Sequence, residues 1–159
     1  NELAAGVTDI RRSEGMLMGT EENKAENNRK KEYLRGYRRH GRKIKRIEAE
    51  IEEIRSMKMY PSMNNDGMPH GTNQSDLSSY AAELREKEDM LYQEGVEAVK
   101  AYKGIEGRIN QLEDQDERDV LFYRYIKGYE WWQVAKVMDR SERTIYRLHG
   151  SALRKMKKI

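Results

Sequence analysis

One predicted C-terminal helix carries the side chains in this chain best suited to chemistry. Residues 141–157 are expected to be helical, with two arginines, a glutamate and a tyrosine on the exposed side. An arginine can donate two hydrogen bonds to guanine, and a glutamate can accept one from the amino group of cytosine. The candidates for contacts with base edges are therefore Glu142, Arg143, Tyr146 and Arg147.

Basic side chains around this helix are candidates for a second kind of contact. Lysine and arginine bind phosphates electrostatically, and such contacts position a protein on DNA without reading its sequence. The phosphate candidates are Lys136, Arg140, Arg154, Lys155, Lys157 and Lys158. Each could instead be an ordinary solvated charge on a helix, but as a set they favour contact with DNA.

The apolar residues in this region predict the two helices that would position these side chains. Val134, Ala135 and Met138 fall on one face of a first helix. In the second helix the apolar residues recur with the spacing of a buried stripe, which is made up of Ile145, Leu148, Ala152, Leu153 and Met156. Ser141 lies between the helices, where its hydroxyl can cap the second one. The pattern predicts a helix-turn-helix whose second helix fits a DNA major groove.

This C-terminal stretch, up to Lys158, resembles region 4 of sigma-70-type factors. The matching segments are DERDVLFYRYIKG, QVAKVM, SERTIYRL and ALRKMKK. The ending YRLHGSAL and the loop GMPHGTNQSD resemble small phage and prophage regulators of the ArpU and RinA late-transcription type. Two residues depart from the sigma-like pattern, because Asp139 stands where glycine is usual and Arg140 where an apolar residue is usual.

The resemblance implies a transcription regulator of phage or prophage type in the cytoplasm of a bacterial host. Double-stranded DNA is the expected partner, and RNA polymerase is a possible second one. Two other functions stay open. One is a DNA-packaging subunit resembling the small terminases of phages, and the other is a coiled-coil adaptor that docks on RNA polymerase.

Two long heptad patterns precede this region. The first runs through a helix expected over residues 27–59, with Tyr33, Tyr37, His40, Ile44, Ile47, Ile51 and Ile54 as its seam. The second comprises Leu77, Ala81, Leu84, Glu88, Leu91, Gly95, Ala98, Tyr102 and Ile105. Two such helices joined by a loop are expected to pack as an antiparallel hairpin that buries the two seams against each other. Glu88 and Gly95 weaken the second seam, so we expect a second copy of the chain to complete it and form a homo-oligomer through the hairpin.

These patterns predict an all-α chain with a long antiparallel, coiled-coil-like hairpin and a sigma region 4-like helix-turn-helix domain. The expected parts are a flexible arm over residues 1–26, the hairpin over 27–106 with a loop at 60–74, and the DNA-binding domain over 107–159. Within that last domain, Asp114 and Glu117 have the spacing of a capping box. Trp131 is expected in the core and Trp132 at the surface, although the sequence leaves the choice between them open.

The distribution of charge supports a polyanionic partner. The formal net charge is only +3, but residues 29–46 hold ten basic residues against one acid, and residues 140–159 hold seven against one. Whether the segment 29–46 contacts DNA or forms a solvated helix face stays open. The chain has no cysteine and no long apolar run, so neither a disulfide framework nor a membrane span is expected. The three histidines, His40, His70 and His149, fall on different elements, so we expect no enzyme activity, metal site or cofactor.

Overall fold

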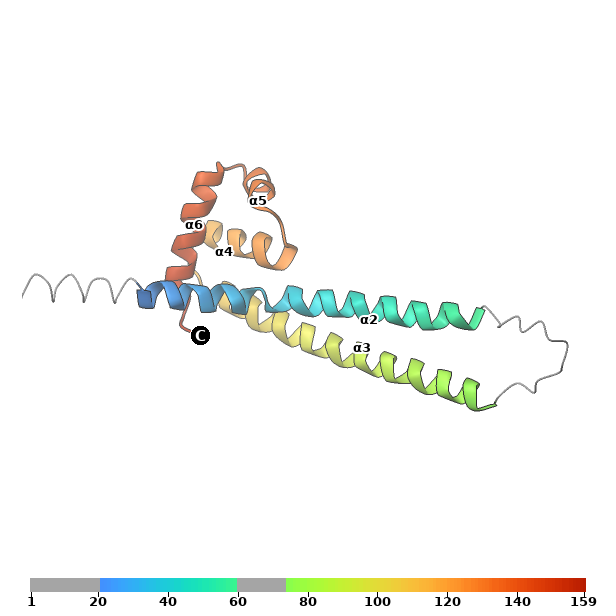
Figure 1. The fold of residues 1–159 in the computed structure, drawn as a ribbon. Coiled ribbons are helices and arrows are strands. Elements are labelled where there is room, and N and C mark those ends of the chain that lie inside the picture. Colours follow the sequence, from blue (N-terminus) through green and yellow to red (C-terminus); the bar gives the residue numbers. More distant parts are fainter. Residues whose placement is uncertain (1–20, 60–73) are drawn as a thin grey trace, which may run out of the picture. The chain divides into compact units, whose positions relative to one another are not determined.

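The computed structural model describes residues 21–59 and 74–159, and the regular elements in these two ranges are all helices (Figure 1). The prediction of an all-α fold is confirmed. Most of the expected arm and loop, residues 1–20 and 60–73, lies outside the described residues. Residues 21–26, which the sequence placed in the arm, are helical.

Short connections join the helices within residues 21–59 and within residues 74–159. A helix over residues 21–34 ends in a turn at Arg35, and α2 (Gly36–Met59) follows it directly. The later elements are α3 (Gln74–Ile109), α4 (Gln115–Leu121), the π-helix η1 (Phe122–Lys127), α5 (Trp131–Val137) and α6 (Glu142–Lys155).

The chain divides into two compact units. We call residues 37–103 the hairpin unit, and the described residues 21–36 and 104–159 the terminal unit. This division differs from the predicted boundaries, because residues 27–36 group with the C-terminal helices rather than with the hairpin.

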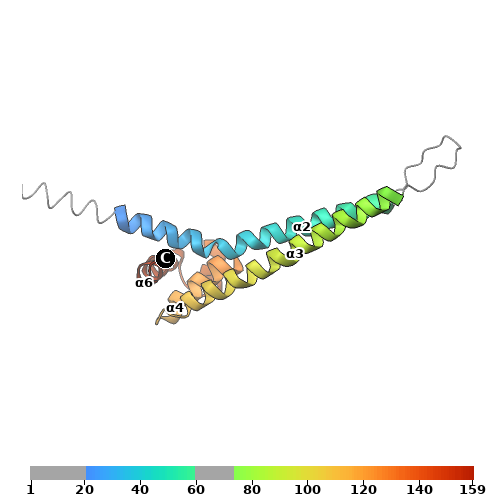
Figure 2. The same ribbon diagram turned by 90° about the horizontal axis from the view of Figure 1, so that it is seen from below.

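Within the hairpin unit, α2 and α3 run side by side (Figure 2). His40 Nδ1 lies 2.5 Å from Glu94 Oε1, and Lys87 Nζ donates to Glu50 Oε2 at 2.8 Å. The partner number falls along α3 as the residue number rises along α2, so the two helices are antiparallel. The predicted α2 seam is buried at Ile47, Ile51 and Ile54 and half-buried at Tyr37, His40 and Ile44.

The α3 side of this seam is poorer, as its sequence predicted. Ala98 is buried, whereas Leu84, Leu91 and Gly95 are only half-buried and Ala81 is exposed. Glu88 is also exposed and accepts a hydrogen bond at 3.1 Å from the Arg55 guanidinium. The seam therefore closes on one chain through isoleucines of α2 and ion pairs across it, and α3 keeps apolar side chains at its surface.

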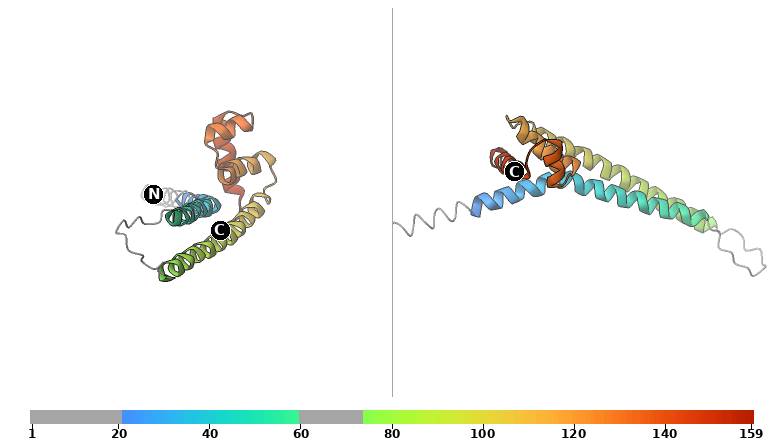
Figure 3. Two further views of the ribbon diagram at one scale, coloured as in Figure 1. Left: turned by 90° about the vertical axis from the view of Figure 1, so that its right-hand side faces the viewer. Right: turned by 90° about the horizontal axis from the view of Figure 1, so that it is seen from above.

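In the terminal unit, α4, α5 and α6 gather into one cluster (Figure 3). The helix over residues 21–34 belongs to the same unit and contributes Leu34, which is fully buried. Lys30 is only 3% exposed, and its ammonium donates to the Leu153 carbonyl at 2.9 Å and lies 3.8 Å from Glu26. A buried cation needs such partners, and here it also satisfies a carbonyl in the last turn of α6.

Candidate nucleic-acid interface

A tight turn joins α5 to α6. Asp139 has a φ of 51°, in the left-handed region that aspartate tolerates better than most residues. The Arg140 N–H then donates to the Ala135 carbonyl at 3.0 Å. The Ser141 hydroxyl accepts from the Thr144 N–H at 3.3 Å and caps α6, as the sequence predicted.

The left-handed conformation of Asp139 predicts how substitutions at this position change the stability of the terminal unit. Replacing Asp139 with valine should destabilise the unit by about 1–2 kcal/mol, because a β-branched residue is strained at positive φ. Asp139→Gly should be neutral or slightly stabilising, since glycine adopts this conformation freely. Urea unfolding followed by tryptophan fluorescence measures both variants. Equal stability of Asp139→Val and the wild type would contradict the strained turn.

The apolar faces of α5 and α6 meet in one core. Val134, Ala135, Ile145 and Leu148 are buried together with Val120 of α4. The rest of the predicted α6 stripe, Ala152, Leu153 and Met156, is also buried. Met138 is half-buried against this cluster. The helix-turn-helix packing predicted from the spacing of these residues is confirmed.

The aromatic side chains divide as expected. Trp131 is half-buried, with its ring centroid 4.9 Å from those of Tyr146 and His149, whereas Trp132 is 57% exposed.

The interior of the terminal unit holds a polar pair, in which Tyr125 Oη lies 2.9 Å from His149 Nε2. Burial lowers the pKa of His149 to about 4 and raises the pKa of Tyr125 to about 12. Both groups are therefore neutral at pH 7, and His149 acts as a core residue rather than a cation for phosphate.

The contacts of Asp114 and Glu117 at the start of α4 differ in part from the predicted capping box. Asp114 caps α4 by accepting from the Glu117 N–H at 3.0 Å. The Glu117 side chain forms no hydrogen bond back to Asp114. Instead Glu117 is buried, with 2% of the residue exposed, and its carboxylate accepts from Lys155 Nζ at 2.7 Å. A local capping box was predicted, but an ion pair with α6 takes its place.

The four base-contact candidates all lie on the exposed side of α6. Glu142, Arg143 and Arg147 are exposed, and none of the three forms an ion pair with another described residue. Tyr146 is 50% exposed and rests against Trp131. The capped helix therefore offers two guanidinium groups, a carboxylate and a phenol from its first two turns, opposite a buried stripe.

The six phosphate candidates are all exposed but differ in their partners. Within the described residues, the Lys136 and Lys157 side chains form no ion pair, and the same holds for Arg154 and Lys158. Lys155 is held by Glu117, and that hydrogen bond raises the pKa of its ammonium. Arg140 Nη2 lies 3.4 Å from Asp116 Oδ2. Lys155 and Arg140 therefore have to leave an acidic partner before they can meet a phosphate.

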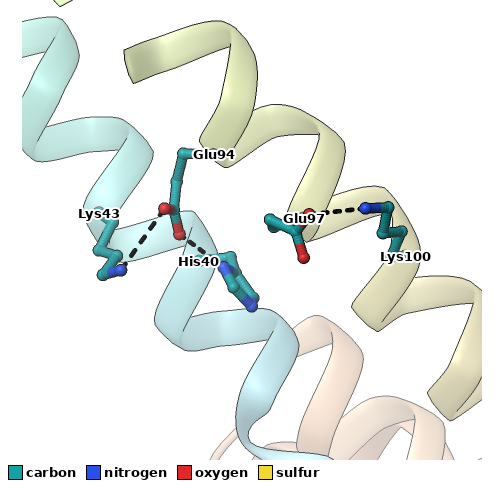
Figure 4. A network of polar contacts seen from close by, with 5 residues as sticks. All are labelled: His40, Lys43, Glu94, Glu97 and Lys100. Atoms are coloured by element: carbon teal, nitrogen blue, oxygen red, sulfur yellow. Dashed lines mark hydrogen bonds and ion pairs between the residues drawn. The ribbon is translucent and has the colours of Figure 1, made fainter.

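The basic segment 29–46 is partly engaged within the protein. Lys30 is buried, and in the hairpin unit Lys43 and Arg46 lie 3.5 Å and 2.9 Å from glutamate oxygens. Figure 4 shows Glu94 between His40 and Lys43, and these two contacts lower the pKa of the Glu94 carboxyl. Some exposed cations remain in the segment without an ion pair to a described residue, namely Arg29, Arg38, Arg42 and Lys45.

Two features are absent from the described residues. No group of three or more histidine and acidic side chains in these residues could hold a metal ion. His70, one of the three histidines, lies outside the described residues. Among the described helices, none combines the length and apolar character that crossing a membrane requires.

Comparison with known proteins places the chain in a family. No curated protein and no solved structure matches the chain. The family model for DUF1492, described as a protein of unknown function, matches residues 54–157. The match begins in α2, runs through α3 and continues through the helix-turn-helix to the end of α6. Because it spans more than half of the 159 residues, the chain belongs to the DUF1492 family.

Proposed function

We propose that this protein is a sequence-specific DNA-binding transcription regulator of phage or prophage type, with α6 as the helix that enters the major groove. The observation that carries the proposal is the pair Arg143 and Arg147. Both are exposed and without an ion pair to a described residue, on the first turns of a capped helix whose opposite face is buried. A recognition helix reads bases with its N-terminal residues.

The cations at the other end of α6 suit a different contact. Lys157 and Lys158 follow the last turn of the helix, where a helix leaving the groove passes the sugar-phosphate backbone. Lys136 is exposed on α5, the helix that precedes the turn. Lys155 ranks below these three because its ammonium already pairs with the buried Glu117 carboxylate.

The resemblance to sigma region 4 supports the same proposal, and the two departures from that pattern have physical explanations. Asp139 adopts the left-handed conformation that glycine usually supplies at this point of the turn. Arg140 replaces an apolar residue, but its side chain is exposed and its guanidinium reaches Asp116, so no charge is buried. Neither residue therefore prevents the turn from forming.

The proposed function predicts a strongly salt-dependent interaction with DNA. If about five basic side chains contact phosphates, the logarithm of the binding constant should fall with the logarithm of salt at a slope of about −4 to −5. Fluorescence anisotropy with a labelled mixed-sequence duplex across a salt series measures this slope. A slope close to zero, or no binding at about 50 mM salt, would contradict DNA binding altogether.

DNA binding and sedimentation together separate the alternative functions. An adaptor that docks on RNA polymerase should show no DNA binding even at low salt. A DNA-packaging subunit should bind DNA but sediment as a large ring-shaped oligomer. Selection of duplexes from a random library would then identify the preferred site of a regulator.

A further inference from the structure

A second periodic stripe runs along α3, beside the seam that faces α2. It consists of Arg85, Asp89, Tyr92, Val96, Val99 and Lys103, which follow one another at spacings of 4, 3, 4, 3 and 4 residues. This is a heptad pattern on one face of the helix. The contacts with α2 come from another face, at Lys87, Glu94 and Tyr102. We call the six residues the outer stripe.

The middle of the outer stripe is apolar and open to solvent. Tyr92 is 70% exposed and Val99 is 54% exposed. Together with Gly95, Val96, Lys100 and Lys103 they line an open groove of about 550 Å³. Gly95 lacks a side chain, and nothing lies within 4 Å of the point where a Cβ would be. Another helix can therefore approach the α3 backbone closely here.

The charged residues next to the apolar centre of the outer stripe, Asp89 and Lys103, indicate what fits this groove. Asp89 lies on one side of the apolar centre and Lys103 on the other, and both are exposed without an ion pair to a described residue. If a second α3 packs in the opposite direction about Val96, each Tyr92 lies within one residue of the level of Val99 of the other copy. Each Asp89 then meets Lys103 of the other copy, so both charge pairs are complementary. A parallel arrangement would place like charges opposite each other.

We propose that the outer stripe of α3 is a self-association surface that packs antiparallel on the outer stripe of a second copy. This surface is separate from the α2 seam, whose isoleucines are already buried within one chain. The stripe extends over about five turns of helix, so the interface is small and we expect reversible association in the micromolar range. The proposal does not depend on DNA binding and is tested without DNA.

Sedimentation velocity of the full chain over a concentration series tests the surface. The wild type should show a monomer–dimer equilibrium, and Val99→Glu should shift it to monomer, because it places a carboxylate in the apolar centre. Glu83→Lys is the matched control for the charge variants below. Glu83 is exposed on the same helix outside the outer stripe, so this substitution should leave the monomer–dimer equilibrium unchanged. Circular dichroism checks that each variant keeps its helix content.

Charge exchange tests the antiparallel register. Asp89→Lys alone and Lys103→Asp alone each place like charges opposite one another, and each should weaken association about tenfold or more. The double variant Asp89→Lys with Lys103→Asp recreates both pairs in reverse and should restore dimerisation. A wild type that remains monomeric, or a dimer insensitive to Val99→Glu, would overturn the surface. A double variant no better than the single ones would overturn the register.

Discussion

Replacing Leu34 with alanine will destabilise the helix-turn-helix, although Leu34 lies far from α5 and α6 in the sequence. Leu34 is fully buried and belongs to the same compact unit as those helices. Removing a buried leucine side chain leaves a cavity and typically costs about 2–5 kcal/mol. Because Lys30, one turn earlier, bonds to the Leu153 carbonyl of α6, a loosened N-terminal helix also releases that contact.

Tryptophan fluorescence during urea unfolding measures this effect. The chain has only two tryptophans, and both lie in α5, so the signal reports on the helix-turn-helix and not on the hairpin. Arg29→Ala is the matched control, since Arg29 is exposed on the same N-terminal helix. It should change the unfolding free energy by no more than about 0.5 kcal/mol. An unchanged transition for Leu34→Ala would show that residues 21–34 are not part of this core.

The helices and turns of the terminal unit could be predicted because residues close together in the sequence determine where each one begins and ends. The apolar spacing from Ile145 to Met156 marks the buried face of α6, and Ser141 marks its start. Gly128 ends η1 with a φ of 77°, in the left-handed conformation that glycine commonly supplies at the C-terminal end of a helix. Asp139 could be assigned to the left-handed turn because it occupies the usual glycine position of a helix-turn-helix. In each case neighbouring residues decide the conformation.

The tertiary partners of charged residues could not be predicted in the same way. Lys30 lies in a basic run that reads as a solvated face, yet its ammonium is buried against a carbonyl 123 residues away. Glu117 has the spacing of a capping box, but its carboxylate binds Lys155 across 38 residues. No periodicity encodes such pairings, because they depend on which helices pack together. These pairings decide which lysines and arginines lack an acidic partner. They therefore decide which of the predicted phosphate contacts can bind DNA without first breaking an ion pair.

The outer stripe of α3 was missed for a related reason. The sequence predicts a single heptad seam on this helix, which includes Leu84, Leu91 and Ala98. Tyr92, Val96 and Val99 follow the same period on another face, and their exposure distinguishes the two faces. The sequence predicts that a second copy completes the seam itself, whereas the proposed surface lies on the neighbouring face of α3.

Truncating Arg143 and truncating Lys157 should affect DNA binding in different ways. Arg143 is exposed on the first turn of α6, within reach of base edges if this helix enters the groove. Arg143→Ala should therefore weaken binding to the preferred site by about 1–3 kcal/mol and relax the preference at one or two base pairs. Lys157 follows the last turn, so Lys157→Ala should weaken binding to all sequences alike and reduce the salt slope by about one.

Binding of each variant to the preferred site and to a scrambled duplex, across a salt series, separates these two roles. The ratio of the two affinities should fall for Arg143→Ala and stay constant for Lys157→Ala. Both residues are exposed and lack an ion pair to a described residue, so neither substitution should alter folding. If Arg143→Ala weakened both duplexes equally, its guanidinium would be a phosphate contact. The assignment of α6 as the helix that reads bases would then have to be abandoned, because Arg143 occupies the position from which such a helix reads.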